Sequence, residues 1–167
     1  MNYFKICSQN ITNYPHFNAF KNIALPLQII GCSGDEIRCR VFEVAKKLKI
    51  DKFLSFKPKQ LSVGQNQRVN IARTLVKKPS VYLFDEMFSN IDLETKNELL
   101  LDLRSMFKEI NKTVVFVTHD PHEAMLLADQ LVILKNGEFI FDDIPSKVFY
   151  SSNQDVKELF EDYYEKN

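Results

Sequence analysis

Three segments of the chain carry apolar residues at helical spacing, and each segment follows a residue that commonly caps a helix. The caps are Ser33, Ser62 and Asp92, and after the first two a Glu or Gln three residues later completes a capping box. The apolar faces comprise Ile37, Val41, Val44, Ala45 and Leu48; Val69, Ala72 and Val76; and Leu99, Leu103, Met106 and Ile110. The pattern predicts helices from about Asp35 to Lys49, after Ser62 and after Asp92.

Short runs of apolar or β-branched residues separate these helices and predict strands. The runs are Tyr3–Ser8, Val81–Phe84, Thr113–Thr118, Leu131–Leu134 and Glu138–Phe141. Asn136-Gly137 predicts a tight hairpin between the last two. The stretch Asn10–Asn22 is expected to be a loop, and short helices are expected from Pro145 and from about Asn153. The alternation indicates an α/β fold, a parallel sheet with helices on both faces.

Composition narrows the classes of function. Of 167 residues, 45% are hydrophobic and 26% are charged, and the 22 basic residues balance the 22 acidic ones. This is ordinary for one globular domain, and no basic stretch interleaved with aromatic residues predicts a nucleic acid as partner. Cys7, Cys32 and Cys39 form no C-x-x-C pair and are expected to be reduced thiols. No apolar run approaches the ~18 residues of a membrane span, so a cytoplasmic protein is expected.

Acidic and polar residues follow two of the predicted strands. Ligands of open α/β sheets bind at the carboxyl ends of strands, which is where Asp85, Glu86 and His119 fall. The two acids have two interpretations: they close a turn, or they offer one oxygen ligand for magnesium and one carboxylate that polarises water. A lone histidine is usually an ordinary residue. The loop of His119 is firmly placed, because Asp120 is a predicted N-cap with Glu123 in the capping-box position.

Four short motifs, in the expected order and spacing, resemble those of the ATP-binding subunits of ABC transporters. They are Leu61–Gln65, similar to the signature motif; Asp85-Glu86, similar to the Walker B acids; Ser89–Asp92, similar to the D-loop; and Thr118–Asp120, similar to the switch histidine. Gln9 then falls at the position of the Q-loop glutamine. The segments Asn13–His16 and Asn22–Leu27 are most similar to the sugar or polyamine importer branch of the family.

The resemblance implies ATP and Mg²⁺ as cofactors and assigns catalytic roles. Asp85 is expected to hold the magnesium and Glu86 to act as general base. His119 is expected to contact the γ-phosphate and to keep the base and the attacking water in line. Gln9 is expected to help ligate the magnesium and to orient that water.

The helix start after Ser62 has a structural and a functional interpretation. As structure, the capping box simply stabilises a helix; as function, its N–H groups and dipole make an anion site. The resemblance implies that Ser62, Gly64 and Gln65 contact ATP held by the opposite subunit of a head-to-tail dimer. It also makes Asp92 a D-loop acid that crosses to that subunit. Val63 replaces the first glycine of the usual signature, and a β-branched residue resists positive φ.

The resemblance also implies a partial P-loop NTPase fold and a set of partners. Residues 1–167 correspond to the C-terminal two-thirds of an ABC nucleotide-binding domain. They are expected to divide into a helical subdomain (23–61), the remainder of the catalytic core (62–144) and C-terminal helices (145–167). The implied partners are permease subunits in the membrane and a second nucleotide-binding subunit. The expected location is cytoplasmic, on the inner face of the cell membrane through the permease.

The phosphate-binding loop of such ATPases, G-x-x-x-x-G-K-[ST], does not occur in these 167 residues, whose glycines are Gly31, Gly34, Gly64 and Gly137. The chain therefore resembles an N-terminally truncated domain, with an incomplete core and exposed apolar edges. Three hypotheses stay open. The chain belongs to the ATPase of an importer that energises solute uptake and is inactive alone; it is a non-catalytic module that supplies the signature motif in trans to a complete partner; or it is a remnant without a cellular role.

Overall fold

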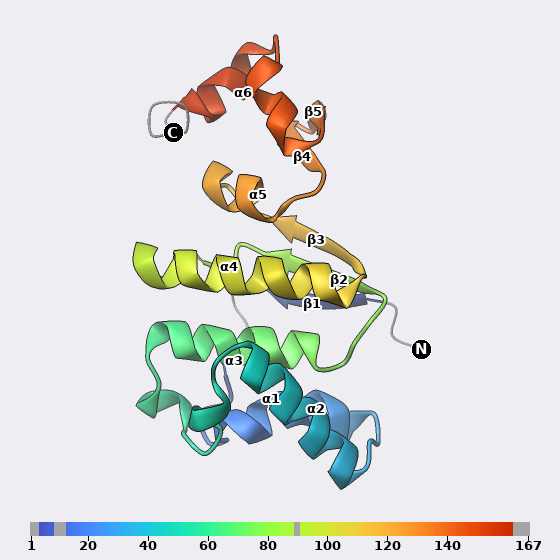
Figure 1. The fold of residues 1–167 in the computed structure, drawn as a ribbon, viewed down its shortest axis with the longest axis vertical. Helices are drawn as coiled ribbons and strands as arrows, with labels where there is room; N and C mark the ends of the chain where they lie inside the picture. Colours follow the sequence, from blue (N-terminus) through green and yellow to red (C-terminus); the bar gives the residue numbers. More distant parts are fainter. Residues whose placement is uncertain (1–3, 9–12, 89–90, 162–167) are drawn as a thin grey trace. The chain divides into compact units, whose positions relative to one another are not determined.

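The computed structural model describes residues 4–8, 13–88 and 91–161 (Figure 1). Gln9, Ser89 and Asn90 lie outside these described residues. The chain divides into two units, Met1–Val117 and Thr118–Asn167, and each unit has its own small sheet.

The first unit has the α/β architecture that the sequence predicts. Its elements are β1 (Phe4–Ser8), α1 (Ala19–Ile29), α2 (Gly34–Lys47), α3 (Val63–Leu75), β2 (Val81–Asp85), α4 (Leu93–Ile110) and β3 (Thr113–Val117), with 3-10 turns at Asp51–Phe53 and Pro58–Gln60. The three strands are parallel in the order β1-β2-β3, and Ile6, Leu83 and Val115 lie in register across them. The carboxyl ends of all three strands therefore meet at one edge.

One face of this sheet is packed against helices. Tyr82 and Phe84 on β2 are 1% and 0% exposed. The ring of Phe84 lies 5.4 Å from that of Phe107 on α4, and the hydroxyl of Tyr82 is 3.5 Å from the carbonyl oxygen of Leu75, the last residue of α3. Both helices thus cover the same face of the strand, because residues two apart on a strand point to the same side.

The other face of the sheet is half open among the described residues. Val115 and Val117, on the side of β3 opposite to Phe116, are 44% and 45% exposed. Leu83, their neighbour on β2, is only partly buried. The exposed apolar surface that the sequence predicts is therefore present on this face.

Helices α1, α2 and α3 form a second packing layer with its own core. Its fully buried side chains are Ile23, Leu27, Val41, Ala45, Leu48 and Ile50. Helix α2 begins after Ser33, whose hydroxyl accepts a hydrogen bond from the N–H of Glu36 at 3.3 Å. It ends at Lys47, two residues earlier than predicted, because Lys49 adopts a left-handed conformation with φ 56°.

The expectation of a loop over Asn10–Asn22 was wrong in its last part, because α1 begins at Ala19. Asn18 caps the helix by accepting a hydrogen bond from the N–H of Lys21 at 2.9 Å. Asn22 is fully buried, accepts from the N–H of Tyr14 at 2.7 Å and donates to three carbonyl oxygens, including that of Phe17. These asparagines are a cap and a buried polar anchor, two roles that look like loop composition in the sequence.

The second unit is a hairpin with short helices. Its elements are α5 (Pro121–Leu127), β4 (Leu131–Lys135), β5 (Glu138–Asp143), a 3-10 helix at Pro145–Tyr150 and α6 (Gln154–Leu159). Asn136 and Gly137 both have positive φ, 53° and 84°, which confirms the predicted hairpin turn. A small core gathers Leu131, Ile133, Val148, Val156 and Phe160. In the described parts of both units, no helix has the length and apolar character that a membrane crossing needs.

The buried hydroxyl of Tyr82 makes the stability of the first unit sensitive to alkali. Burial raises the pKa of Tyr82 from 10.0 to about 12. The folded state thus holds the proton more tightly than the unfolded state, so the stabilisation is complete below pH ~10 and is lost as the pH rises through about 12. We expect Tyr82→Phe to remove about 2–3 kcal/mol of the fall in the free energy of unfolding over this window. Urea denaturation at pH 9 to 12 measures it.

The control is Tyr150→Phe, because Tyr150 is 88% exposed. That variant should follow the parent chain at every pH. A parallel loss of stability in the parent and in Tyr82→Phe would contradict the assignment.

Candidate functional site

The start of α3 is held by a complete capping box. The hydroxyl oxygen of Ser62 accepts a hydrogen bond from the N–H of Gln65 at 3.2 Å, and the amide oxygen of Gln65 accepts one from the N–H of Ser62 at 3.0 Å. Ser62 and Val63 are exposed at this end. The φ of Val63 is not positive, so its β-branched side chain is compatible with the helix start. The first turn keeps N–H groups directed outward, as an anion site requires.

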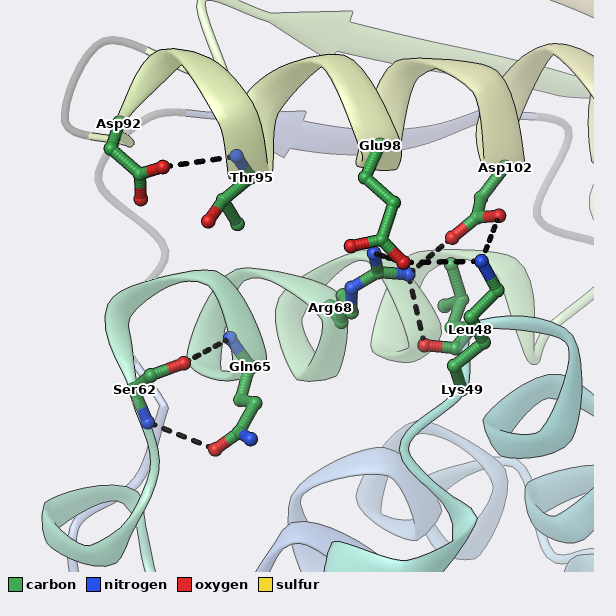
Figure 2. Close-up of polar contacts among 9 residues, drawn as sticks. All are labelled: Leu48, Lys49, Ser62, Gln65, Arg68, Asp92, Thr95, Glu98 and Asp102. Carbon is green, nitrogen blue, oxygen red and sulfur yellow. Dashed lines mark hydrogen bonds and ion pairs between the residues drawn. The ribbon is translucent and has the colours of Figure 1, made fainter.

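The starts of α3 and α4 lie side by side. Figure 2 shows both helices running in the same direction, with Ser62 and Asp92 at the same end. A Cβ at position 64 would overlap the Cγ2 methyl of Thr95, so the backbone of α3 approaches α4 as closely as only glycine allows. Two of the predicted ATP-binding segments, the signature motif and the D-loop acid, are therefore brought together by this contact.

Asp92 caps α4, as predicted. Its carboxylate accepts a hydrogen bond from the N–H of Thr95 at 3.0 Å. The backbone and the side chain of Thr95 hold the pKa of Asp92 below its ordinary value. The hydrogen bonds that form the cap thus favour the ionised carboxylate of Asp92 over its protonated form.

A network of charged side chains joins α3 and α4 farther along (Figure 2). Arg68 is only 6% exposed; its guanidinium donates to the carboxylate of Asp102 at 2.5 Å and to the carbonyl oxygen of Leu48 at 3.2 Å. It also lies 3.4 Å from Glu98. Lys49 contacts the same two acids, Asp102 at 2.9 Å and Glu98 at 3.1 Å, and the hydrogen bond to Asp102 raises the pKa of Lys49.

The two acids after β2 lie at the carboxyl edge of the sheet. Asp85 is exposed and Glu86 is partly buried. Glu86 adopts φ 45°, which is uncommon for a residue with a side chain, and its N–H donates to the carbonyl oxygen of Val117 at 3.0 Å. The side-chain amide of Gln67 on α3 donates to the carbonyl oxygen of Met87 at 2.8 Å. The strained turn is thus held from β3 and from α3.

His119 belongs to the second unit, in the turn that leads into α5. Asp120 caps α5 by accepting from the N–H of His122 at 2.9 Å. The capping box expected with Glu123 was wrong, since Glu123 is buried and its carboxylate accepts from the hydroxyl of Thr118 at 2.6 Å. His119 itself is exposed. Gln9 lies outside the described residues.

The described residues offer some of the contacts that a magnesium-bound nucleotide needs. The described residues contain no group of three or more His, Cys, Asp or Glu side chains able to enclose a metal. Mg²⁺ needs no such cage, because it is usually held by one or two carboxylates together with phosphate oxygens and water, and Asp85 offers one exposed carboxylate at the strand tip. The helix start at Ser62 offers a contact for phosphate.

Sequence reasoning missed Arg68, Asp102 and Thr95. Arg68 stands four residues before Ala72, on the apolar side of α3, and a charged residue on such a side is a signal of burial with a partner. Asp102 follows Glu98 by four residues, which puts both acids on one side of α4. Only the packed structure pairs these acids with Arg68.

A pocket of about 250 Å³ opens elsewhere in the first unit, at Tyr82 and the ends of α2 and α4. Two of its lysines pair with acids of the same rim, Lys47 with Glu109 at 2.5 Å and Lys78 with Glu43 at 3.0 Å. The predicted site residues in the described part of the chain are not among its lining residues. The pocket is therefore separate from the candidate site.

Comparison with known proteins finds the family that the sequence motifs resemble. The family described as ABC transporter matches residues 2–89, just over half of the chain. The lactose transport ATP-binding protein LacK of Rhizobium radiobacter is 43% identical over 129 residues, 77% of this chain and 36% of the relative. The sn-glycerol-3-phosphate import ATP-binding proteins UgpC of Vibrio vulnificus and Yersinia pestis are 41% and 40% identical over 85% and 84% of this chain. The chain spans less than half of the length of these relatives, 36% to 40%.

The contact between Gly64 and Thr95 can be tested by a double-mutant cycle. Gly64→Ala should lower the free energy of unfolding by about 1–3 kcal/mol, because the new methyl group meets Thr95 Cγ2. Thr95 cannot simply rotate, since its side chain bonds to Asp92. Adding Thr95→Ser removes the methyl and should restore most of the loss. Urea denaturation of the two single variants and the double variant measures the coupling.

Gly34→Ala is the matched control, because Gly34 also lies in the first turn of a helix and a Cβ there meets open space. It should leave stability unchanged or raise it slightly. Equal effects of alanine at the two glycines would refute the close approach.

Proposed function

The chain belongs to the ABC transporter family, and we propose that it acts as ATP-binding subunit of an importer, coupling ATP hydrolysis to the uptake of a solute. The sugar and glycerol-phosphate importers among its relatives support this class of transport. Further support comes from the parallel starts of α3 and α4, where Ser62, Gly64 and Asp92 lie at one end. The hydroxyl of Ser62 and the first-turn N–H groups of α3 are the groups that would contact a phosphate there.

In the proposed reaction, each site residue has the role that the resemblance to the family implies. Asp85 would hold Mg²⁺ at the strand tip, and the ion, when bound, neutralises charge on the phosphates. Glu86 would accept a proton from the attacking water. Gln9 would orient that water and share the metal, and His119 would hold the base and the γ-phosphate in line. The strained backbone of Glu86 supports the assignment, because such strain is common at functional sites.

The start of α3, with Ser62, Gly64 and Gln65, would act across a dimer interface. The hydroxyl of Ser62 accepts from the N–H of Gln65 and can donate its own hydrogen to a phosphate oxygen. Gly64 is buried against Thr95 of α4, so it would support this contact indirectly, by letting the starts of α3 and α4 lie side by side. The proposed partners are therefore a second nucleotide-binding subunit, arranged head to tail, and permease subunits that place the assembly on the cytoplasmic face of the membrane.

The 167-residue chain alone is proposed not to hydrolyse ATP. Its residues do not include G-x-x-x-x-G-K-[ST], the loop whose backbone cradles the phosphates. Without that loop, the contacts proposed for the nucleotide are the exposed helix start at Ser62 and a few polar side chains, among them Asp85. Each such contact is modest when it is exposed to water.

Titration of Mg-ATP into the 167-residue chain tests this point. We expect calorimetry to detect no binding tighter than a Kd of about 1 mM, which corresponds to about −4 kcal/mol. A complete ATP-binding subunit of an importer, titrated under the same conditions, is the positive control. Micromolar binding by the chain, or measurable ATP hydrolysis, would contradict the proposal.

A second candidate function is a non-catalytic module that supplies the signature edge to a complete partner. One observation favours it. The capping box at Ser62 and the close packing of Gly64 on α4 are both formed, although these 167 residues do not include the phosphate-binding loop. In this case Ser62, Gly64 and Gln65 serve the ATP of the partner.

A complementation assay tests the second candidate. The chain is mixed with a complete importer subunit whose own signature serine is replaced by arginine, so that this subunit cannot serve its own dimer. We expect the native chain to raise the ATPase rate of that subunit and Ser62→Arg to abolish the effect by blocking the phosphate contact. An unchanged rate with the native chain would exclude the module.

A further inference from the structure

Helix α3 faces α4 with two residues spaced one turn apart. Gly64 and Arg68 are four residues apart and therefore lie on the same side of α3. On α4, Thr95, Glu98 and Asp102 are three and four residues apart and share the side that meets α3. The contact surface between the helices thus has two separate points, one steric and one ionic.

Both helices pack on β2, and their direct contact begins in the first turn, where the backbone at Gly64 touches the methyl of Thr95. This steric contact defines one point of the interface. Arg68 provides a second point one turn farther along, which limits pivoting about the first. Its planar guanidinium reaches Asp102, Glu98 and the carbonyl oxygen of Leu48 in fixed directions.

Electrostatics makes the second contact necessary. Two parallel helices that start side by side place the positive ends of their dipoles next to each other, which is unfavourable. The acids of α4 and the buried guanidinium of α3 attract each other across the same interface. Lys49 adds a second cation to Asp102 and Glu98 from the segment after α2.

We propose that Arg68 is a positioning residue for the start of α3, the part of the signature motif that would contact phosphate. Through Asp102 and Glu98, Arg68 sets the orientation of this helix start relative to the start of α4 at Asp92. It touches no substrate and acts through the helices. This inference rests on the proposed function for its consequence, the alignment of Ser62 and Gly64 with a phosphate. Its structural content, the relative orientation of the two helix starts, is independent of that function.

The structural content can be measured directly by EPR. Nitroxide labels are attached through Val63→Cys and Leu93→Cys, since both side chains are exposed at the two helix starts. The native cysteines are first replaced by Cys7→Ser, Cys32→Ser and Cys39→Ser. The dipolar coupling between the labels reports their distance distribution under native conditions.

We expect Arg68→Lys to broaden this distribution and shift it to longer distance, because an ammonium group cannot reach all three acceptors at once. Asp102→Asn keeps the size of the side chain and removes its charge, and it should act in the same direction. The matched control is Arg104→Lys, since Arg104 lies exposed on α4. That control should leave the distribution unchanged.

A merely structural role gives a different result. In that case Arg68→Lys and Asp102→Asn would lower the midpoint of urea denaturation while the distance distribution of the folded chain stays that of the parent. This outcome overturns the proposal. Circular dichroism identifies the folded variants, and the use of two independent variants keeps the test decisive where one of them does not fold.

The complementation assay then separates this inference from the proposed function. Without spin labels, Arg68→Lys should lose most of the stimulation of the partner's ATPase rate, whereas Arg104→Lys should retain it. A changed distance distribution with no stimulation by the native chain means that Arg68 positions the helices and that the functional proposal fails. An unchanged distance distribution together with full stimulation by Arg68→Lys means that the functional proposal stands and that Arg68 does not position the helices.

Discussion

The interface between α3 and α4 depends on one buried charge. Removing an arginine from water is unfavourable unless its donors are satisfied, and Arg68 satisfies them with Asp102, Glu98 and the carbonyl oxygen of Leu48. Losing one partner of such a buried pair typically costs about 3–5 kcal/mol, because the remaining charge stays buried. The end of α2, the signature helix and α4 are therefore held in one arrangement.

The packing of α3 on α4 sets where the first turns of these two helices lie relative to each other. Ser62 and Asp92 each cap their own helix, a local matter that short-range hydrogen bonds settle. Their nearness is not local, since it needs a glycine at position 64 beside Thr95 and an ionic contact one turn on. The side-by-side placement of the two helix starts is thus a product of helix packing, built on caps that would form in either helix alone.

The two faces of the sheet in the first unit are buried to different extents. Its strand-tip acids are carried by a β2 strand whose Tyr82 and Phe84 are completely buried against α3 and α4. On the other side Val115 and Val117 remain nearly half exposed, an apolar strip that favours association. The carboxylates of Asp85 and Glu86 therefore lie at the edge of a sheet that, among the described residues, is firmly packed on one face only.

The sequence by itself determined the parallel α/β class, the caps at Ser62 and Asp92, the strand ending at Asp85 and the hairpin at Asn136-Gly137. Each depends on periodicity or on contacts between residues a few positions apart, which the order of amino acids encodes directly. It did not reveal the start of α1 at Ala19, because a capping or buried asparagine has the same composition as a loop. Nor did it reveal the partners of Arg68, since Asp102 is 34 residues away and Leu48 is 20. Only tertiary structure decided those pairings, because the burial that makes an ion pair strong arises when distant helices pack together.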